Sequence, residues 1–425
     1  MSTFSSQGVL LVALALLAGC TAGSAPPPQD SGTITIVFKH GKFAGDPEAF
    51  TALLRDFERR TPGVVVKEEV LPASTDQQHQ FYVVNLEGRS VAFDLLAVDV
   101  IWAQEFARAG WLAELDHLLQ PAEREDQFPE MIRAATYAGR LYAIPWYMEA
   151  GLLYYRRDLL ERYGLAPPRT WPELVAAVHA IQRGERDPGL QGFLWQGKQY
   201  EGLVCVAHEL AWGGGADLLE GGADAAQAVS FMRRLVGEAV SPASVATADE
   251  ETTRRLFGAG RAIFMRNWSY AWTLLQQDGS PVRDKVGLAP LPAFPGHESV
   301  SALGGWLLAV PKRAAHPREA QALIRYLTSP EVQRRLTLDL GYQPARRDLY
   351  RDAALMEAKP WLRDLLPVLS AARSRPVTPY YLTLSHILQP ELSAALVAAK
   401  SPEEALASAK RQVGALLGSR PWERG

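Results

Sequence analysis

The sequence predicts an α/β protein of two to three domains, or one large body with two lobes, and two observations support this prediction. Along the N-terminal part, β-branched segments alternate with amphipathic helical segments, which indicates a mostly parallel sheet covered by helices on both faces. The chain has 425 residues, more than one typical domain, yet no long linker or low-complexity stretch divides it after residue 32. We therefore expect lobes that share the chain, which crosses between them more than once.

The first elements follow from local signals. The β-branched run 33–39 predicts a strand, and Asp46-Pro47-Glu48 has the cap, proline and acid that begin a helix. Four apolar residues then recur at helical spacing, namely Phe50, Leu53, Leu54 and Phe57. Pro62-Gly63 ends this helix before a second strand over 64–70.

The pattern continues with a helix over 75–88, a strand over 92–98 and a helix over 101–110. Later helices carry clear start signals: a capping box from Thr170 to Glu173, and Ser-Pro pairs at 329–330 and 401–402. The segment 288–296 is rich in Pro and Gly and predicts an ordered connection.

The N-terminus carries an apolar run over 9–18, which is too short to span a bilayer but typical of a secretory signal. It ends in Leu17-Ala18-Gly19-Cys20, which resembles the cleavage site of bacterial lipoprotein signals, although no Lys or Arg precedes the run. We expect residues 1–19 to be a signal peptide, Cys20 to be lipidated and to anchor the chain to the membrane, and residues 20–32 to be a tether. The alternative is an ordinary buried N-terminal helix.

Composition excludes several classes of protein. A formal net charge of −3, with no basic run, offers no surface for a nucleic-acid backbone. The two cysteines, Cys20 and Cys205, cannot form a zinc cluster or a disulfide framework, and the apolar run 202–207 predicts that Cys205 is a buried thiol. No histidine pair has zinc-protease spacing, and no G-x-S-x-G elbow occurs. We expect no catalytic residue, metal or cofactor.

Aromatic residues instead stand in unusual places, next to Gly, Pro and charged residues. They occupy the segments PWYME at 145–149, RNWSYAW at 266–272, Gly304-Gly305-Trp306, and Tyr380-Tyr381 after Arg375. Sugars offer C–H faces for aromatic stacking and hydroxyls for carboxylate and Arg hydrogen bonds, so we expect these segments to be irregular and to bind a neutral saccharide. The alternative for each aromatic residue is core packing.

At this point the chain resembles the extracellular solute-binding proteins of ABC sugar importers, and most of all the trehalose/maltose-binding branch. The resembling stretches are GLLYYRRDLLERYG at 151–164, WQGKQYEGLVC at 195–205, RNWSYAW at 266–272, VRDKVGLAPLPAFPGH at 282–297 and LGGW at 303–306. With weaker matches between them, the resemblance covers about residues 33–415.

The resemblance implies a periplasmic-binding-protein-like fold, in which two α/β lobes close by a hinge motion on a ligand cleft between them. One lobe would hold residues 33–141 and about 288–340, and the other 142–287 and about 341–425. It also implies that a monomer binds a disaccharide such as trehalose or maltose and delivers it to ABC permease subunits, with no chemical step.

The resemblance further implies a set of ligand-binding residues. Trp268 and Trp306 would stack on the sugar, Tyr270 and Gly305 would line the same wall, Asp46, Asp99 and Glu149 would accept hydroxyls, and Tyr147, Arg375 and Tyr381 would complete the polar ring. The chain departs from the branch at Glu149, where the branch has Asp, and at residues 78–80, where Gln-His-Gln stands in a region that carries Arg. Both departures bear on which disaccharide fits.

Two other hypotheses remain open. A surface carbohydrate-active enzyme could use two of Asp46, Asp99 and Glu149 as an acid/base pair, which requires carboxyl groups about 5–10 Å apart. A sugar co-receptor could instead pass the signal of a bound sugar to a sensor.

Overall fold

The computed structural model describes residues 32–43, 46–72 and 74–418 of the chain. Its strands are β1 (Ile34–Gly41), β2 (Val64–Leu71), β3 (Leu95–Asp99), β4 (Thr136–Tyr137), β5 (Arg140–Leu141), β6 (Ile144–Arg156), β7 (Gln191–Leu194), β8 (Ala262–Trp268), β9 (Val286–Ala289), β10 (Leu303–Ala309) and β11 (Gln343–Pro344). Within the described residues, nine strands form one sheet in the order β2-β1-β3-β10-β6-β8-β7, with β9 and β11 also paired to β6. Residues 1–19, most of the expected tether and Cys20 lie outside the described residues.

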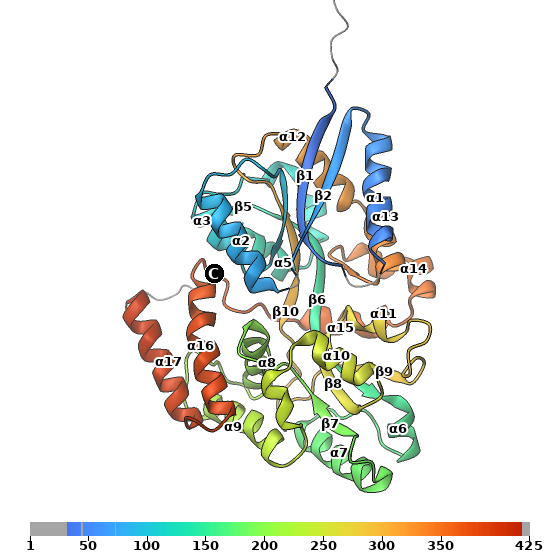
Figure 1. Ribbon diagram of the computed structural model, residues 1–425, viewed down its shortest axis with the longest axis vertical. Helices are drawn as coiled ribbons and strands as arrows, with labels where there is room; N and C mark the ends of the chain where they lie inside the picture. The colour runs from blue at the N-terminus through green and yellow to red at the C-terminus, as the bar shows by residue number, and fades with distance from the viewer. Residues whose placement is uncertain (1–31, 44–45, 73, 419–425) are drawn as a thin grey trace, which may run out of the picture.

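Helices surround this sheet in an upper and a lower group, which are the two lobes (Figure 1). The helices of the first half of the chain are α1 (Pro47–Arg60), α2 (Thr75–Glu87), α3 (Ala103–Arg108), α4 (Pro121–Glu125), α5 (Pro129–Ala135), α6 (Arg157–Arg162), α7 (Trp171–Glu185) and α8 (Glu201–Trp212). Those of the second half are α9 (Ala223–Gly237), α10 (Glu250–Gly258), α11 (Ala271–Leu275), α12 (Pro317–Leu327), α13 (Pro330–Arg335), α14 (Ala353–Ala358), α15 (Leu362–Ala371), α16 (Tyr381–Leu396) and α17 (Pro402–Leu417).

The N-terminal β–α–β unit confirms the sequence prediction closely. Asp46 caps α1 by accepting a hydrogen bond from the backbone N–H of Glu48, at 3.0 Å, and Pro47 occupies the first helical position. The predicted apolar stripe, from Phe50 to Phe57, is buried against the sheet. β1 and β2 pair in parallel from Ile34 opposite Val64. Strand β3 begins at Leu95, three residues later than predicted.

The expectation of a mostly parallel sheet is wrong. Parallel pairing is confined to β1–β2, β1–β3 and β7–β8, whereas β6 and β10 run antiparallel to every strand they pair with. Consecutive strands of a β–α–β unit are parallel because the helix returns the chain to the end of the sheet at which the first strand began. β6 and β10 instead carry the chain between the lobes in opposite directions, and they therefore pair antiparallel.

Strand β6 belongs to both lobes. From Ile144 to Ala150 it pairs with β10, and from Gly151 to Tyr155 it pairs with β8. The chain thus crosses between the lobes first along β6 and again along β10. It crosses a third time between β11, which pairs with the first part of β6, and α15, which packs on β6 and β9. This crossing pattern agrees with the expected shared chain; the exact residue limits of each lobe stay a prediction.

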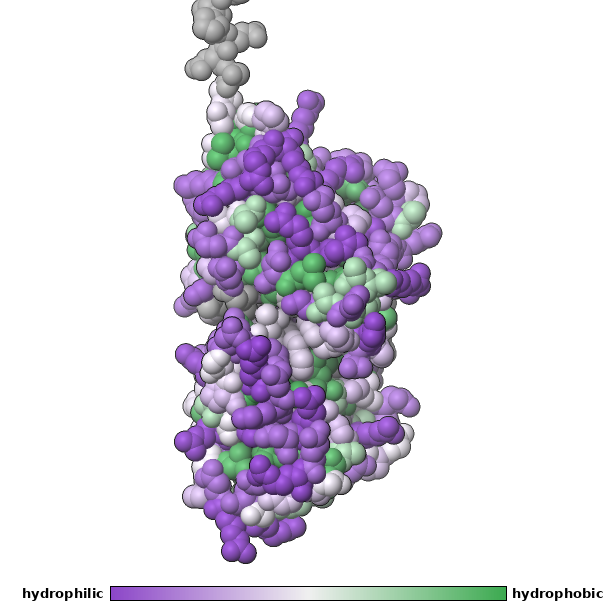
Figure 2. All heavy atoms as spheres, turned by 90° about the vertical axis from the view of Figure 1, so that its right-hand side faces the viewer, coloured by the Kyte–Doolittle hydropathy of each residue, from purple (hydrophilic) through white to green (hydrophobic). Residues whose placement is uncertain are grey.

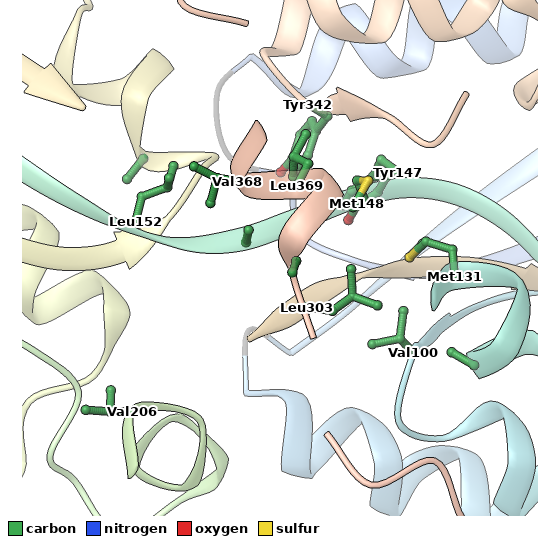
Figure 3. Close-up of a cluster of buried hydrophobic side chains, with 14 of the residues drawn as sticks. Val100, Met131, Tyr147, Met148, Leu152, Val206, Leu303, Tyr342, Val368 and Leu369 are labelled. Atoms are coloured by element: carbon green, nitrogen blue, oxygen red, sulfur yellow. The ribbon is translucent and has the colours of Figure 1, made fainter. Parts of the chain in front are cut away.

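A continuous apolar core surrounds the place where β6 changes partners (Figure 3). Met148 and Leu152 lie on β6, Leu303 lies at the start of β10, and all three are buried. Tyr342 and Tyr147 meet there with their ring centroids 4.5 Å apart. This apolar packing joins the two lobes. Among the described residues the one cysteine, Cys205, is free, so no disulfide there links the lobes.

The face shown in Figure 2 is mainly hydrophilic, and apolar residues reach it in small separate groups. Val65, Val84 and Leu416 are examples of isolated exposed apolar side chains. No helix among the described residues has the length and apolar character needed to cross a membrane.

Candidate ligand-binding site

Strand β10 brings four predicted site residues into register. Trp306 lies directly opposite Asp99 of β3 on one side and opposite Tyr147 of β6 on the other. Gly304 lies opposite Glu149. Because residues directly opposite each other in neighbouring strands project to the same face, the indole of Trp306, the carboxylate of Asp99 and the phenol of Tyr147 share one face of the sheet.

Gly304 and Gly305, which precede Trp306, lie where a side chain would crowd neighbouring atoms. Gly305 adopts φ +124°, and a Cβ there would lie 2.5 Å from the carbonyl oxygen of Tyr147. A Cβ on Gly304 would lie 3.0 Å from the indole of Trp268. Glycine at these two positions therefore allows β10 to approach β6 and the tryptophan of the lower lobe closely.

The lower lobe supplies a second aromatic wall at the end of β8. The indole N–H of Trp268 donates to Glu250 at 3.2 Å, and the guanidinium of Arg266 lies 4.0 Å from the ring centre. The Tyr270 hydroxyl donates to Glu251 at 2.9 Å. These contacts fix both rings. The guanidinium of Arg266 covers one face of the Trp268 indole.

Arg375 and Tyr381 come from the C-terminal part of the chain and meet on one carboxylate. Arg375 donates from Nη1 and Tyr381 from its hydroxyl to Oε1 of Glu201, each at 2.6 Å. Arg375 also donates to the carbonyl of Leu303 at 3.1 Å and lies 3.9 Å from Asp99. The guanidinium thus links α8, the start of β10 and the end of β3.

Burial acts on the two acidic residues of this site. It raises the pKa of Asp99 to about 6, against the lowering effects of Arg375 and the backbone N–H of Ile101. Burial also raises the pKa of Glu149 to about 8, opposed by a backbone hydrogen bond from Tyr270. Oε1 of Glu149 is buried without a hydrogen-bond partner. A protonated Glu149 can donate as well as accept, while an ionised Asp99 accepts, and this combination matches hydroxyl groups.

Asp46 is the exception among the predicted residues. Its side chain is exposed and caps α1, and none of its contacts within the described part of the chain involves the other predicted site residues. The neighbouring residues 44–45 lie outside the described residues. A contact between Asp46 and a ligand stays a prediction.

The expectation that the aromatic segments are irregular is wrong for four of the aromatic residues predicted to bind the ligand, of which Tyr381 begins α16. Tyr147, Trp268 and Trp306 lie on strands β6, β8 and β10. The flanking Gly and Pro residues suggested loops, but in this fold they serve close strand packing and the ends of strands.

Several residues that contact the predicted ones were not recognised from the sequence. They are Trp102, whose ring meets Trp306 at 5.6 Å, Tyr342 beside Tyr147, and the acids Glu201, Glu250 and Glu251. Each acid stands in the first turn of a helix, where acids are common for electrostatic reasons alone. Only Glu201 had another signal, because it lies within the WQGKQYEGLVC stretch.

Residues 78–80 on α2 stand where the resembling branch carries Arg, and the contacts of Gln78 and His79 are not those of a ligand-binding cation. Gln78 is buried and donates to the carbonyl of Pro72 at 2.8 Å. His79 lies 2.9 Å from Glu105 and stacks on Phe106. Both side chains are therefore engaged within the upper lobe. Among the described residues, no group of His, Cys, Asp and Glu is arranged to hold a metal ion.

Two lobes that share three crossings, with aromatic rings and buried polar groups from both lobes around one place, have the architecture of a two-lobed ligand-binding protein. The chain belongs to the family of bacterial extracellular solute-binding proteins, whose family model matches residues 41–334. Members of this family are binding components of ABC transporters and not enzymes.

Individual relatives agree with this assignment. A probable ABC transporter-binding protein of Deinococcus radiodurans is 36% identical over 374 residues, which are 85% of this chain and 88% of the relative. The maltose-bound structure of MalE3 from T. maritima is 36% identical with a TM-score of 0.84, over 90% of this chain and 100% of that one. A solute-binding protein of Agrobacterium vitis with bound D-mannitol, 22% identical with a TM-score of 0.77 over 90% of this chain and 98% of its own, shares the fold.

Proposed function

We propose that this chain binds a disaccharide, such as maltose or trehalose, between its lobes and delivers it to the permease of an ABC importer. The observation that carries the proposal is the pair of partly exposed indoles, Trp306 from the upper lobe and Trp268 from the lower. They border Asp99 and Glu149, so aromatic faces and hydroxyl-binding groups stand together. Support also comes from the maltose-bound T. maritima protein, which is 36% identical.

The proposal is tested by calorimetric titration of a chain that begins at Gly32. Maltose, trehalose, sucrose, longer maltodextrins and mannitol are the ligands, and mass spectrometry of the recovered sugar follows. We expect saturable binding of one intact disaccharide per chain. Binding of none of these ligands would contradict the proposal, and a cleaved product would favour the carbohydrate-active enzyme.

We further propose that lipid on Cys20 anchors the mature chain outside the cytoplasmic membrane. Support comes from the Leu17-Ala18-Gly19-Cys20 sequence after the apolar run, since Cys20 itself lies outside the described residues. Cys20→Ala is expected to move the protein from the membrane fraction to the soluble fraction of fractionated cells. A Thr21→Ala variant is the matched control, and a Cys20→Ala protein that stays with the membranes would contradict the anchor.

A further inference from the structure

Glu201 accepts hydrogen bonds from three side chains far along the chain, two of which are predicted site residues. It begins α8 and is buried. Its Oε1 accepts from Arg375 and from Tyr381, each at 2.6 Å, and its Oε2 accepts from the hydroxyl of Ser385. One carboxylate thus holds Arg375 and Tyr381, the two residues of the C-terminal part that the family resemblance assigns to the ligand.

Arg375 is a single buried cation between two carboxylates, one from each lobe. Nη1 is bonded to Glu201 of the lower lobe at 2.6 Å, whereas Asp99 of the upper lobe lies 3.9 Å from Nη2. The first distance is a charge-assisted hydrogen bond, and the second is longer than any hydrogen bond. Arg375 also donates from Nη2 to the carbonyl of Leu303 at 3.1 Å, on the strand between the lobes, and from Nη1 to Sγ of Cys205 at 3.4 Å.

We propose that Glu201 is a positioning residue, which retains Arg375 and Tyr381 in the lower lobe and thereby leaves Asp99 free to accept a sugar hydroxyl. The inference rests on the proposed function, because it takes Asp99 and Arg375 as part of the sugar site.

The physical reason is the need of a buried guanidinium for a counter-charge. Without the charge of Glu201, Arg375 would be buried with uncharged acceptors only, such as the Leu303 carbonyl and the Cys205 sulfur, which is costly for a cation. Asp99 is the other carboxylate within 4 Å of Arg375 among the described residues. A small side-chain rotation would close that distance, and the Asp99 oxygens would then be occupied by Arg375 when the sugar arrives.

The charged groups around Asp99 predict that the pKa of Asp99 falls when Glu201 loses its charge. Arg375 and His79 lower the pKa of Asp99, while Glu201 and burial raise it. The carboxyl of Glu149 on β6 also interacts with Asp99, as does the phenol of Tyr147. Removing Glu201 takes away one repulsion and lets Arg375 approach, so both effects lower the pKa of Asp99 from about 6.

The experiment uses Glu201→Gln, which keeps the shape of the side chain and loses its charge. Maltose and trehalose are titrated into the wild type, Glu201→Gln, Asp99→Asn and the double variant from about pH 4.5 to about pH 8. We expect Glu201→Gln to weaken binding about tenfold or more near neutral pH, the loss typical of a charge-assisted hydrogen bond. We also expect the acid limb of its affinity profile to move to lower pH.

The double variant separates positioning from a general structural role. If Glu201 acts through Asp99, Glu201→Gln has a much smaller effect in the Asp99→Asn background than in the wild type. Ser385→Ala is the matched control, because it removes a hydrogen bond to the same carboxylate and leaves the ion pair with Arg375; its affinity should stay within about twofold of the wild type. Equal effects of Glu201→Gln in both backgrounds, or an unshifted acid limb, would overturn the inference.

A ligand-free crystal structure of Glu201→Gln gives a readout that does not depend on sugar binding. We expect the Arg375 guanidinium to lie within hydrogen-bond distance of Asp99. A guanidinium that keeps its position would overturn the inference even if sugar binding is confirmed. A wild-type chain that binds no sugar, together with a shifted Arg375, would overturn the proposed function and retain the link between Glu201, Arg375 and Asp99.

Discussion

Two carboxyl groups in one site respond differently to burial because their neighbours differ. Asp99 faces the guanidinium of Arg375 and a backbone N–H, which hold its pKa to about 6. Glu149 has no cation within ion-pair distance among the described residues and one oxygen without a partner, and its pKa rises to about 8. At neutral pH the site therefore offers one acceptor and one group that can donate, which suits a hydroxyl.

Glu149→Gln should make the free energy of unfolding less dependent on pH. The folded protein holds this carboxyl protonated up to about pH 8, whereas the unfolded chain ionises near 4.5. The wild type therefore loses stability as pH rises through this window, by a few kcal/mol at about 1.4 kcal/mol per pKa unit. Urea unfolding at several pH values measures the slope, with exposed Glu161→Gln as the control. The same slope in Glu149→Gln and the wild type would contradict the assigned pKa.

Trp306→Ala should weaken disaccharide binding by at least about 30-fold, the effect of losing an aromatic hot spot of about 2 kcal/mol. The indole lies partly exposed between Asp99 and Tyr147, so its exposed part can stack on a sugar. Calorimetry measures the affinity, and circular dichroism confirms the fold. Trp111→Ala, which removes another partly exposed indole of the upper lobe, is the control. Unchanged affinity in Trp306→Ala would show that this ring is not a stacking surface.

The residues of the site differ in how far the sequence could predict them. Trp306 and Glu149 stand in short motifs with Gly or aromatic neighbours, and the structure brings both to the same region. Glu201 and Glu250 act only through partners far along the chain, such as Arg375 and Trp268. No local pattern encodes such long-range contacts, and an acid in a first helical turn has an ordinary explanation.

At the scale of elements, capped helices were predictable and the central strand was not. α1, α7 and α17 begin where their Asp46, Thr170 and Ser401 caps predict. β6 is buried over nearly its whole length, so its sequence lacks the alternation of a half-exposed strand. A continuous apolar run cannot be distinguished from a buried helix by periodicity alone.

Thr170→Ala should lower the free energy of unfolding by about 1 kcal/mol, the usual cost of losing a helix cap. The Thr170 hydroxyl accepts from the N–H of Glu173 at 3.4 Å, and the Glu173 side chain binds the backbone N–H groups of Arg169 and Thr170 in return. α7 lies at the outer end of the lower lobe, far from the site (Figure 1), so sugar affinity should not change. Chemical denaturation measures stability, and Thr170→Ser should restore it. An unchanged midpoint in Thr170→Ala would show that the cap contributes nothing measurable.

At the scale of the whole molecule, the same strands that build the site also connect the lobes. β6 changes partners between Ala150 and Gly151, one residue beyond Glu149, and β10 begins three residues before Trp306. A Cβ on Gly151 would lie 2.0 Å from Glu209 Oε1, so the backbone there approaches a buried ion pair of the lower lobe. Rotation of one lobe at this junction would therefore move Trp268 and Trp306 relative to each other.

Disaccharide binding should accordingly make the molecule more compact. Sugar that contacts Trp306 and Asp99 of one lobe and Trp268 and Arg375 of the other favours the closed arrangement by its differential affinity for it. Small-angle X-ray scattering with and without saturating maltose should give a smaller radius of gyration with the sugar. Trp306→Ala at the same sugar concentration should show a reduced change, and galactitol serves as an unrelated polyol control. If maltose binds with full occupancy and the radius of gyration stays constant, the lobes do not close on the ligand, and the partner change in β6 is a rigid joint instead of a hinge.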